Sequence, residues 1–180
     1  MGASMTNRYD IVPATDGAWL DEVRDVFAEY GRAVAALAGA SLSQQGFDSE
    51  LASLPGKYAP PLGNVYLAID ESAGSNRPRV AGCIALRPLK PIAGRDNPAA
   101  KVGEVKRMYV RPEYQRRGIG RMLAEELIAY ARLQDYTLLR LDTSSTMQPA
   151  INLYRALGFV PCERYNDDPM DDTLYFELAF

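Results

Sequence analysis

The chain has 180 residues, of which 47% are hydrophobic and 24% are charged, enough for one domain with a buried core. Its formal net charge of −3 argues against a nucleic-acid partner held by general electrostatics. The sequence shows neither an apolar run that could cross a bilayer nor a secretory signal at its start, so we expect a cytoplasmic protein that does not bind membranes.

Hydrophobic periodicity and the positions of glycine and proline predict a single α/β domain over residues 7–180, after a disordered leader over residues 1–6. Asp16 is the expected N-cap of a first helix, and a second, alanine-rich helical piece is expected after Gly31. In chain order, the predicted elements are a strand over 8–13, these two helices, a helix fragment over 47–54, strands over 64–70, 79–86 and 104–110, a helix after Gly120, a strand over 137–142, a helix over 148–157, and an antiparallel pair over 160–165 and 173–180.

The sequence contains no histidine, which excludes a histidine-based triad, a zinc site with histidine ligands and an imidazole proton shuttle. Acid and base chemistry must therefore be carried by carboxylates, tyrosines, thiols or water. Cys83 and Cys162 lie far apart in apolar, strand-like segments. This placement predicts two buried thiols rather than a disulfide or a metal site, and we expect no bound metal.

The most informative segment runs from Val105 to Leu123 and joins a strand to a helix. Pro112 removes a ladder donor after the strand, and Gly118 and Gly120 allow the backbone to turn closely around a ligand. The unpaired N–H groups of the first helical turn point toward this loop, where the helix dipole also favours an anion. Positive charge is added by Arg116, Arg117 and Arg121. The segment predicts a phosphate-binding loop, although an ordinary strand-to-helix turn with a basic rim is also compatible with it.

Two better-known phosphate motifs do not match this loop. A Walker-type loop needs a lysine followed by serine or threonine after its second glycine, but Gly120 is followed by Arg121 and Met122. A dinucleotide-binding Gly-x-Gly-x-x-Gly sequence needs a third glycine where Leu123 stands. Both of these nucleotide-binding classes are therefore excluded.

The chain resembles the GCN5-related N-acetyltransferases (GNAT family) in two motifs. The diphosphate loop of that family, Gln/Arg-x-x-Gly-x-Gly/Ala, is matched by residues 115–120, and the preceding Val-x-Pro by residues 110–112. A second family signature, Ala-x-x-x-Tyr-x-x-x-Gly-Phe, is matched by residues 150–159. The order of the predicted elements, β-α-α-β-β-β-α-β-α-β-β, extends the resemblance over most of the remaining chain.

The resemblance implies a mixed, twisted, mostly antiparallel sheet whose fourth and fifth strands splay apart to admit the pantetheine arm of acetyl-CoA. The implied cofactor contacts are backbone groups of Met108, Tyr109 and Val110 on the pantetheine and the thioester carbonyl, and Gln115, Arg116, Arg117, Gly118, Ile119, Gly120 and Arg121 on the diphosphate. Unpaired amides at a strand end suit this role because they are fixed before charge develops on the carbonyl oxygen.

Direct transfer requires an uncharged amine, because an alkylammonium with a pKa near 10 has no lone pair. The resemblance implies that Glu104 is the base, acting directly or through water, and that Tyr154 protonates or hydrogen-bonds the departing thiolate. Each has a structural alternative: Glu104 as a solvated or ion-paired residue at a strand start, and Tyr154 as a core residue. Many relatives carry an asparagine where this chain has Met147. The candidates that would replace its contact with the cofactor are Asn152 or the cluster of Ser144, Ser145 and Thr146.

The resemblance places the acceptor site between the first two helices and the loop that joins the last two strands, near Phe27, Tyr30 and Tyr58. The last loop carries Asp167, Asp168, Asp171 and Asp172, which would either attract a cationic amine or form a solvated hairpin. Three functions remain open: an acetyl-CoA-dependent N-acetyltransferase acting on a small-molecule or amino-acid-like amine, a protein N-terminal or lysine acetyltransferase, and a non-catalytic acyl-CoA sensor. Because exposed closing strands often pair in this family, the resemblance also makes a homodimer a candidate assembly.

Overall fold

A computed structural model describes residues 8–38, 44–73, 79–167 and 172–180 of the chain. Its helices and strands follow the predicted order. They are β1 (Tyr9–Pro13), α1 (Leu20–Ala38), α2 (Gln44–Ala52), β2 (Asn64–Asp70), β3 (Arg79–Leu89), β4 (Val102–Val110), α3 (Ile119–Leu133), β5 (Leu138–Ser144), α4 (Gln148–Ala156), β6 (Val160–Pro161) and β7 (Thr173–Ala179). Short 3-10 turns lie at Gly56–Tyr58, Glu71–Ala73 and Pro112–Tyr114.

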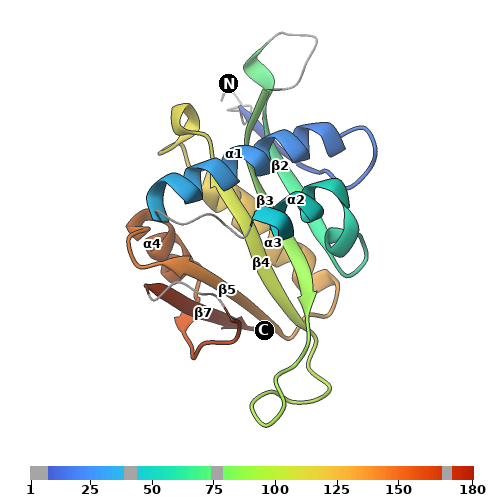
Figure 1. The fold of residues 1–180 in the computed structure, drawn as a ribbon, viewed down its shortest axis with the longest axis vertical. Coiled ribbons are helices and arrows are strands. Elements are labelled where there is room, and N and C mark those ends of the chain that lie inside the picture. The colour runs from blue at the N-terminus through green and yellow to red at the C-terminus, as the bar shows by residue number, and fades with distance from the viewer. Residues whose placement is uncertain (1–7, 39–43, 74–78, 168–171) are drawn as a thin grey trace, which may run out of the picture.

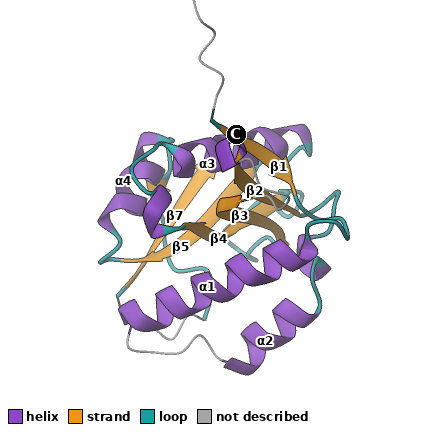
Figure 2. Cartoon of the chain, turned by 90° about the horizontal axis from the view of Figure 1, so that it is seen from above, coloured by secondary structure: helices purple, strands orange, loops and turns teal. Residues whose placement is uncertain are grey.

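The strands form one sheet in the order β1-β2-β3-β4-β5-β7-β6, in which only β4 and β5 are parallel neighbours. One face of the sheet is covered by α1 and α2, and the other by α3 and α4 (Figure 2). Each face has its own apolar core: Val26 and Phe27 of α1 pack with Leu67 of β2, while Leu123 of α3 packs with Leu139 of β5. Both layers are therefore built by strands that bury side chains on both faces.

The fourth and fifth strands diverge, as predicted. They pair only at Val102 with Leu138, Gly103 with Leu139 and Glu104 with Arg140. Beyond these pairs, β4 and β5 separate toward α4 (Figure 1). The facing edge of β4 over residues 105–110 is thereby free of strand pairing, which is the condition for backbone groups to bind an extended ligand.

A β-bulge lies in β4 within the stretch that is paired with β3 but not with β5. Cys83 pairs with Tyr109 and Ala85 with Lys106, so β4 contains one residue more than β3 over the same length. The extra residue distorts the backbone at Arg107, whose φ is 59°. A left-handed conformation in a residue with a side chain costs roughly 1–3 kcal/mol and requires support from its surroundings.

Most boundaries move by a few residues, and two elements differ more clearly from the sequence prediction. The first helix runs unbroken through Gly31. This glycine makes room for α2, because a Cβ at Gly31 would lie 2.7 Å from Cε1 of Phe47. Strand β6 has two residues rather than the six predicted over 160–165. Pro161 has no N–H for a ladder, and the chain leaves the sheet after the amide of Cys162 donates to the carbonyl of Tyr175 at 2.9 Å.

Several smaller predictions have different outcomes. Gly158 ends α4 with a φ of 93°, as expected of a left-handed helix stop. Cys83 is buried and Cys162 is half-buried, and both thiols are free. The predicted leader over residues 1–6 lies outside the described residues. None of the described helices is long and apolar enough to cross a membrane.

Candidate active site

The loop between β4 and α3 has the geometry of an anion-binding nest. Arg116 and Gly118 have φ values of 59° and 80°, so the backbone turns twice into the left-handed region. Within the described chain, no group accepts a hydrogen bond from the amides of residues 116–120. The next two amides, of Arg121 and Met122, bond to the carbonyl of Gly118 at 3.0 and 3.1 Å. Five consecutive free amides at a helix N-terminus match the oxygens of a diphosphate.

The side chains around this loop divide into two groups. Arg116 and Arg117 are exposed on the loop, and Arg117 donates to the hydroxyl of Tyr9 at 3.1 Å. Arg121 instead pairs with Glu125 on its own helix at 3.2 Å. The side chain of Gln115 turns back and donates to the carbonyl of Val110 at 3.1 Å, which ties the loop to the end of β4. Arg116 and Arg117 are therefore the cations better placed for a diphosphate.

Backbone packing leads from this loop to the divergent strands. A Cβ at Gly120 would lie 3.1 Å from Cε of Met108 and 3.4 Å from Leu153, so glycine allows α3 to start directly against β4 and α4. Met108, Tyr109 and Val110 are half-buried. They lie on the part of β4 that has no strand partner on its β5 side. The loop and the gap are thus continuous, and their residues fit a cofactor with a diphosphate at one end and an extended amide-bearing arm at the other.

Tyr154 lies on α4 on the α3–α4 side of the sheet and is 5% exposed. It packs against Phe159 and lines a small apolar hollow with Val105 and Leu127. Burial raises the pKa of this phenol, and the nearby Tyr30 and Asp142 raise it further. A raised pKa keeps the phenol protonated and able to donate.

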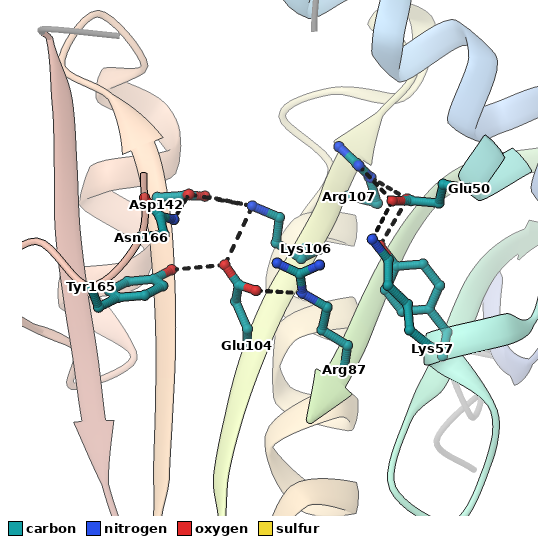
Figure 3. A network of polar contacts seen from close by, with 10 residues as sticks. Glu50, Lys57, Arg87, Glu104, Lys106, Arg107, Asp142, Tyr165 and Asn166 are labelled. Atoms are coloured by element: carbon teal, nitrogen blue, oxygen red, sulfur yellow. Dashed lines mark hydrogen bonds and ion pairs between the residues drawn. The ribbon is translucent and has the colours of Figure 1, made fainter. Parts of the chain in front are cut away.

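Glu104 is fully buried at the last residue pair of β4 and β5. Its Oε2 accepts from Nε of Arg87 at 2.5 Å, and its Oε1 accepts from the hydroxyl of Tyr165 at 3.2 Å (Figure 3). The ammonium of Lys106 lies 3.5 Å from Oε1. Both carboxylate oxygens are thus engaged, and direct contact with an acceptor would require Tyr165 or Lys106 to move.

A polar bridge crosses the gap beside Glu104 (Figure 3). Lys106 of β4 donates to the two oxygens of Asp142 of β5 at 3.0 and 3.3 Å, and the amide of Asn166 donates to Asp142 at 2.6 Å. Burial alone raises the pKa of Asp142, but the charge and hydrogen bonds of Lys106 and Asn166 lower it overall. The sequence indicates Lys106 through its alternation with Glu104, and the resemblance indicates the loop that begins at Asn166, whereas Tyr165 reads only as the end of a strand.

The predicted acceptor residues are not equivalent. Phe27 and Tyr58 are fully buried and pack edge to face with ring centroids 5.9 Å apart, so they are core residues with no surface for an acceptor. The sequence places both aromatic residues at apolar positions, and periodicity alone does not distinguish a core position from the lining of a pocket. Tyr30 is half-buried, and its ring packs edge to face against that of Tyr109 with centroids 6.4 Å apart. Of the three predicted acceptor residues, Tyr30 is therefore the remaining candidate.

The remaining candidates are Asn152, which was expected to replace a family asparagine, and the aspartates of the loop between the last two strands. Asn152 is exposed on α4, and Met147 caps the start of that helix. In the acidic loop, Asp167 is exposed, and Asp172 accepts from the hydroxyl of Ser144 at 2.5 Å. Asp168 and Asp171 lie outside the described residues. Among the described residues, no group of three or more possible ligands could hold a metal ion.

A second buried ion pair lies behind the bulge of β4. Nε and NH2 of Arg107 donate to the two oxygens of Glu50 at 2.8 and 2.9 Å, and both residues are 8% exposed. Lys57 and the hydroxyl of Tyr58 also contact Glu50, at 2.5 and 2.8 Å. Burial alone raises the pKa of Glu50, but the hydrogen bonds and charges of Arg107 and Lys57 lower it to about 2.

This lowered pKa predicts a loss of stability in acid. The ordinary pKa of the carboxyl is 4.5, so the stabilisation from Glu50 is fully present above that pH and is lost as pH falls toward about 2. The difference in unfolding free energy between the wild type and Glu50→Gln, measured by urea denaturation, should therefore shrink across this range. A difference that stays constant from pH 4.5 to pH 2 would contradict the assignment.

Comparison with known proteins agrees with this geometry. The sequence model of the acetyltransferase (GNAT) family matches residues 57–159. An uncharacterized N-acetyltransferase of Schizosaccharomyces pombe is 35% identical over 140 residues, which cover 78% of each chain. An acetyltransferase structure from Streptococcus agalactiae has a TM-score of 0.72 at 16% identity, covering 97% of this chain and 99% of that one.

A structure of a GNAT family acetyltransferase from Elizabethkingia anophelis, solved with acetyl-CoA bound, has a TM-score of 0.60 at 20% identity and covers 97% of this chain and 100% of that one. At these identities the two solved structures support the fold alone. Membership of the family is shown by the family match and by the relative from Schizosaccharomyces pombe. The free amides of the β4–α3 loop are the structural counterpart of the first motif, and α4 with its left-handed stop at Gly158 is the counterpart of the second. The chain therefore belongs to the GNAT acetyltransferase family, and it is an N-acetyltransferase with an acetyl-CoA-binding fold.

Proposed function

We propose that this enzyme transfers an acetyl group from acetyl-CoA to a primary amine of a small-molecule or amino-acid-like acceptor, by direct attack in a ternary complex. The observation that carries the proposal is the continuous path from the free amides of residues 116–120 to the unpaired edge of β4. Acetyl-CoA supplies the activated acetyl group. The residues of the chain bind it, orient it and handle the protons.

Donor binding is assigned to two backbone segments. The amides of residues 116–120, with Arg116 and Arg117, would hold the diphosphate. Backbone groups of Met108, Tyr109 and Val110 would pair with the amide-bearing arm, because β5 has left this edge. One of these N–H groups would stabilise negative charge on the carbonyl oxygen during transfer.

Proton handling is assigned to two side chains on opposite sides of the gap. Tyr154, whose raised pKa keeps the phenol neutral, would hydrogen-bond or protonate the departing thiolate from the α3–α4 side. On the α1–α2 side, Glu104 would take the acceptor's proton through water, since its own oxygens are held by Arg87 and Tyr165. The bridge of Lys106 and Asp142 lies beside this path.

A small acceptor is favoured by the closure of the acceptor side. Tyr165 and Asn166 reach from the segment after β6 to Glu104 and Asp142, and thus cover the gap between the strands. The ring of Tyr30 packs against Tyr109 at the neighbouring position. A peptide needs an open groove past the reacting amine, whereas a small amine needs only a pocket.

A screen of acceptors tests this proposal. The enzyme would be incubated with acetyl-CoA and matched panels of small amines, amino acids and peptides, and transfer would be read by release of free thiol. We expect transfer to members of the small-molecule panels at rates well above those for peptides. Faster transfer to peptide N-termini or lysines would instead identify a protein acetyltransferase, and calorimetric binding of acetyl-CoA without transfer to any amine would identify an acyl-CoA sensor.

A further inference from the structure

We propose that Glu50 and Arg107 are positioning residues that hold the end of β4 in the conformation that presents its amides to the thioester. The inference rests on the proposed function, because it takes the segment 108–110 as the thioester-binding edge. Neither residue touches the substrates in this assignment. Their effect on the reaction passes through the backbone of β4.

The bulge at Arg107 determines which way the following residues point. With this extra residue in β4, Met108 packs into the core under α3 and α4, and Tyr109 packs into the core under α1 and α2. Without it, every later residue of β4 would exchange faces, because side chains in a strand alternate. The orientation of the amides at 108–110 therefore depends on the backbone conformation at Arg107.

That conformation is unfavourable for arginine and is held from several directions. The backbone φ is 59°, a region that side chains with a Cβ disfavour. The guanidinium makes two hydrogen bonds to Glu50, and it lies over the rings of Tyr30 at 5.4 Å and Phe47 at 4.9 Å. The thiol of Cys83 donates to the carbonyl of Arg107 at 3.1 Å. Both the side chain and the backbone of this residue are thus fixed.

Glu50 connects this point to the acceptor-side helices. It lies on α2 and is itself held by Lys57 and by the hydroxyl of Tyr58. A buried ion pair often adds little net stability compared with apolar residues of similar size, but it specifies one arrangement among several. The pair therefore suits a device that sets geometry: it aligns α2, the ring of Tyr30 and the end of β4 in one arrangement.

The test compares two double variants that both lack the ion pair. Glu50→Gln with Arg107→Gly keeps a residue that adopts positive φ readily, whereas Glu50→Gln with Arg107→Ala does not. Neither variant leaves an unpaired buried charge at this pair. Calorimetry would give the Kd values of acetyl-CoA and of CoA for each, and steady-state kinetics would give kcat.

We expect the glycine variant to keep the wild-type ratio of the two Kd values within about twofold. In the alanine variant, the preference for acetyl-CoA over CoA, measured as the ratio of their Kd values, should fall about five- to tenfold, which is the scale of one hydrogen bond to the carbonyl. Its kcat should fall about tenfold. The Kd of CoA alone should change little, because the diphosphate loop is untouched. The single variant Glu50→Gln should resemble the alanine variant.

A matched control is the buried pair of Arg140 and Asp96, which also makes two hydrogen bonds, at 2.5 and 2.8 Å, but in a strand without a bulge. Asp96→Asn should lower stability and leave the ratio of the two Kd values unchanged. Equal losses for the glycine and alanine variants, or equal weakening of acetyl-CoA and CoA, would overturn the inference. If the wild type binds no acetyl-CoA, the proposed function itself fails, and the inference fails with it.

Discussion

Replacing Gly118 with valine should weaken the binding of acetyl-CoA at least tenfold. Gly118 precedes α3 with a φ of 80°, and a Cβ there would meet no atom within 4 Å, so the penalty is conformational rather than steric. A β-branched residue disfavours this conformation by at least ~1–2 kcal/mol, and the loop would turn its amides away from the diphosphate. Isothermal titration calorimetry with acetyl-CoA measures the effect directly.

Gly94 provides a matched control for this substitution. It has a φ of 78°, a Cβ there would also meet nothing within 4 Å, and it lies in the exposed loop between β3 and β4. Gly94→Val introduces the same strain and should leave the Kd of acetyl-CoA unchanged. Equal Kd values for Gly118→Val and the wild type would remove the phosphate-binding role from the β4–α3 loop.

Replacing Tyr154 with phenylalanine should lower kcat by ~10²-fold or more while changing the Kd of acetyl-CoA little. The ring remains in the core beside Phe159, so packing is preserved and only the hydroxyl is lost. A positioned general acid contributes about this factor to proton transfer. Pre-steady-state measurement of thiol release would show whether the loss lies in the transfer step.

Tyr66→Phe is the appropriate comparison, because Tyr66 is also 5% exposed and lies on β2, away from the gap. Its hydroxyl accepts from Asn64 rather than facing the divergent strands. This variant should retain the wild-type kcat. A kcat within threefold of wild type for Tyr154→Phe would assign Tyr154 to core packing alone.

The sequence predicted the parts of the fold that depend on local pattern. The order of elements and the left-handed stop at Gly158 follow from periodicity and glycine placement. These features are encoded within short segments and can be read without knowledge of tertiary contacts. The divergence of the fourth and fifth strands was predicted only through the family resemblance.

The remaining features depend on contacts between distant segments. Gly31 reads as a break in a helix, but its role is set by the ring of Phe47 on α2. Phe27 and Tyr58 read equally well as pocket or core, and only their mutual packing decides. The partners of Glu104 include Tyr165, which is 61 residues away in the sequence. The loop with free amides was thus predictable, and the side-chain partners on the acceptor side were much less so. The roles assigned to individual site residues stay predictions.

The short seam between β4 and β5 has a mechanical consequence. The half of the sheet formed by β5, β7 and β6 is joined to β4 by three backbone pairs at one end. Farther along, side chains join them through the Lys106–Asp142 bridge and the hydrogen bond from Tyr165 to Glu104. A substrate arm lying in the opening would supply the hydrogen bonds of the missing ladder. The donor would then act as a temporary strand, and the rigidity of the whole sheet would rise and fall with each catalytic cycle.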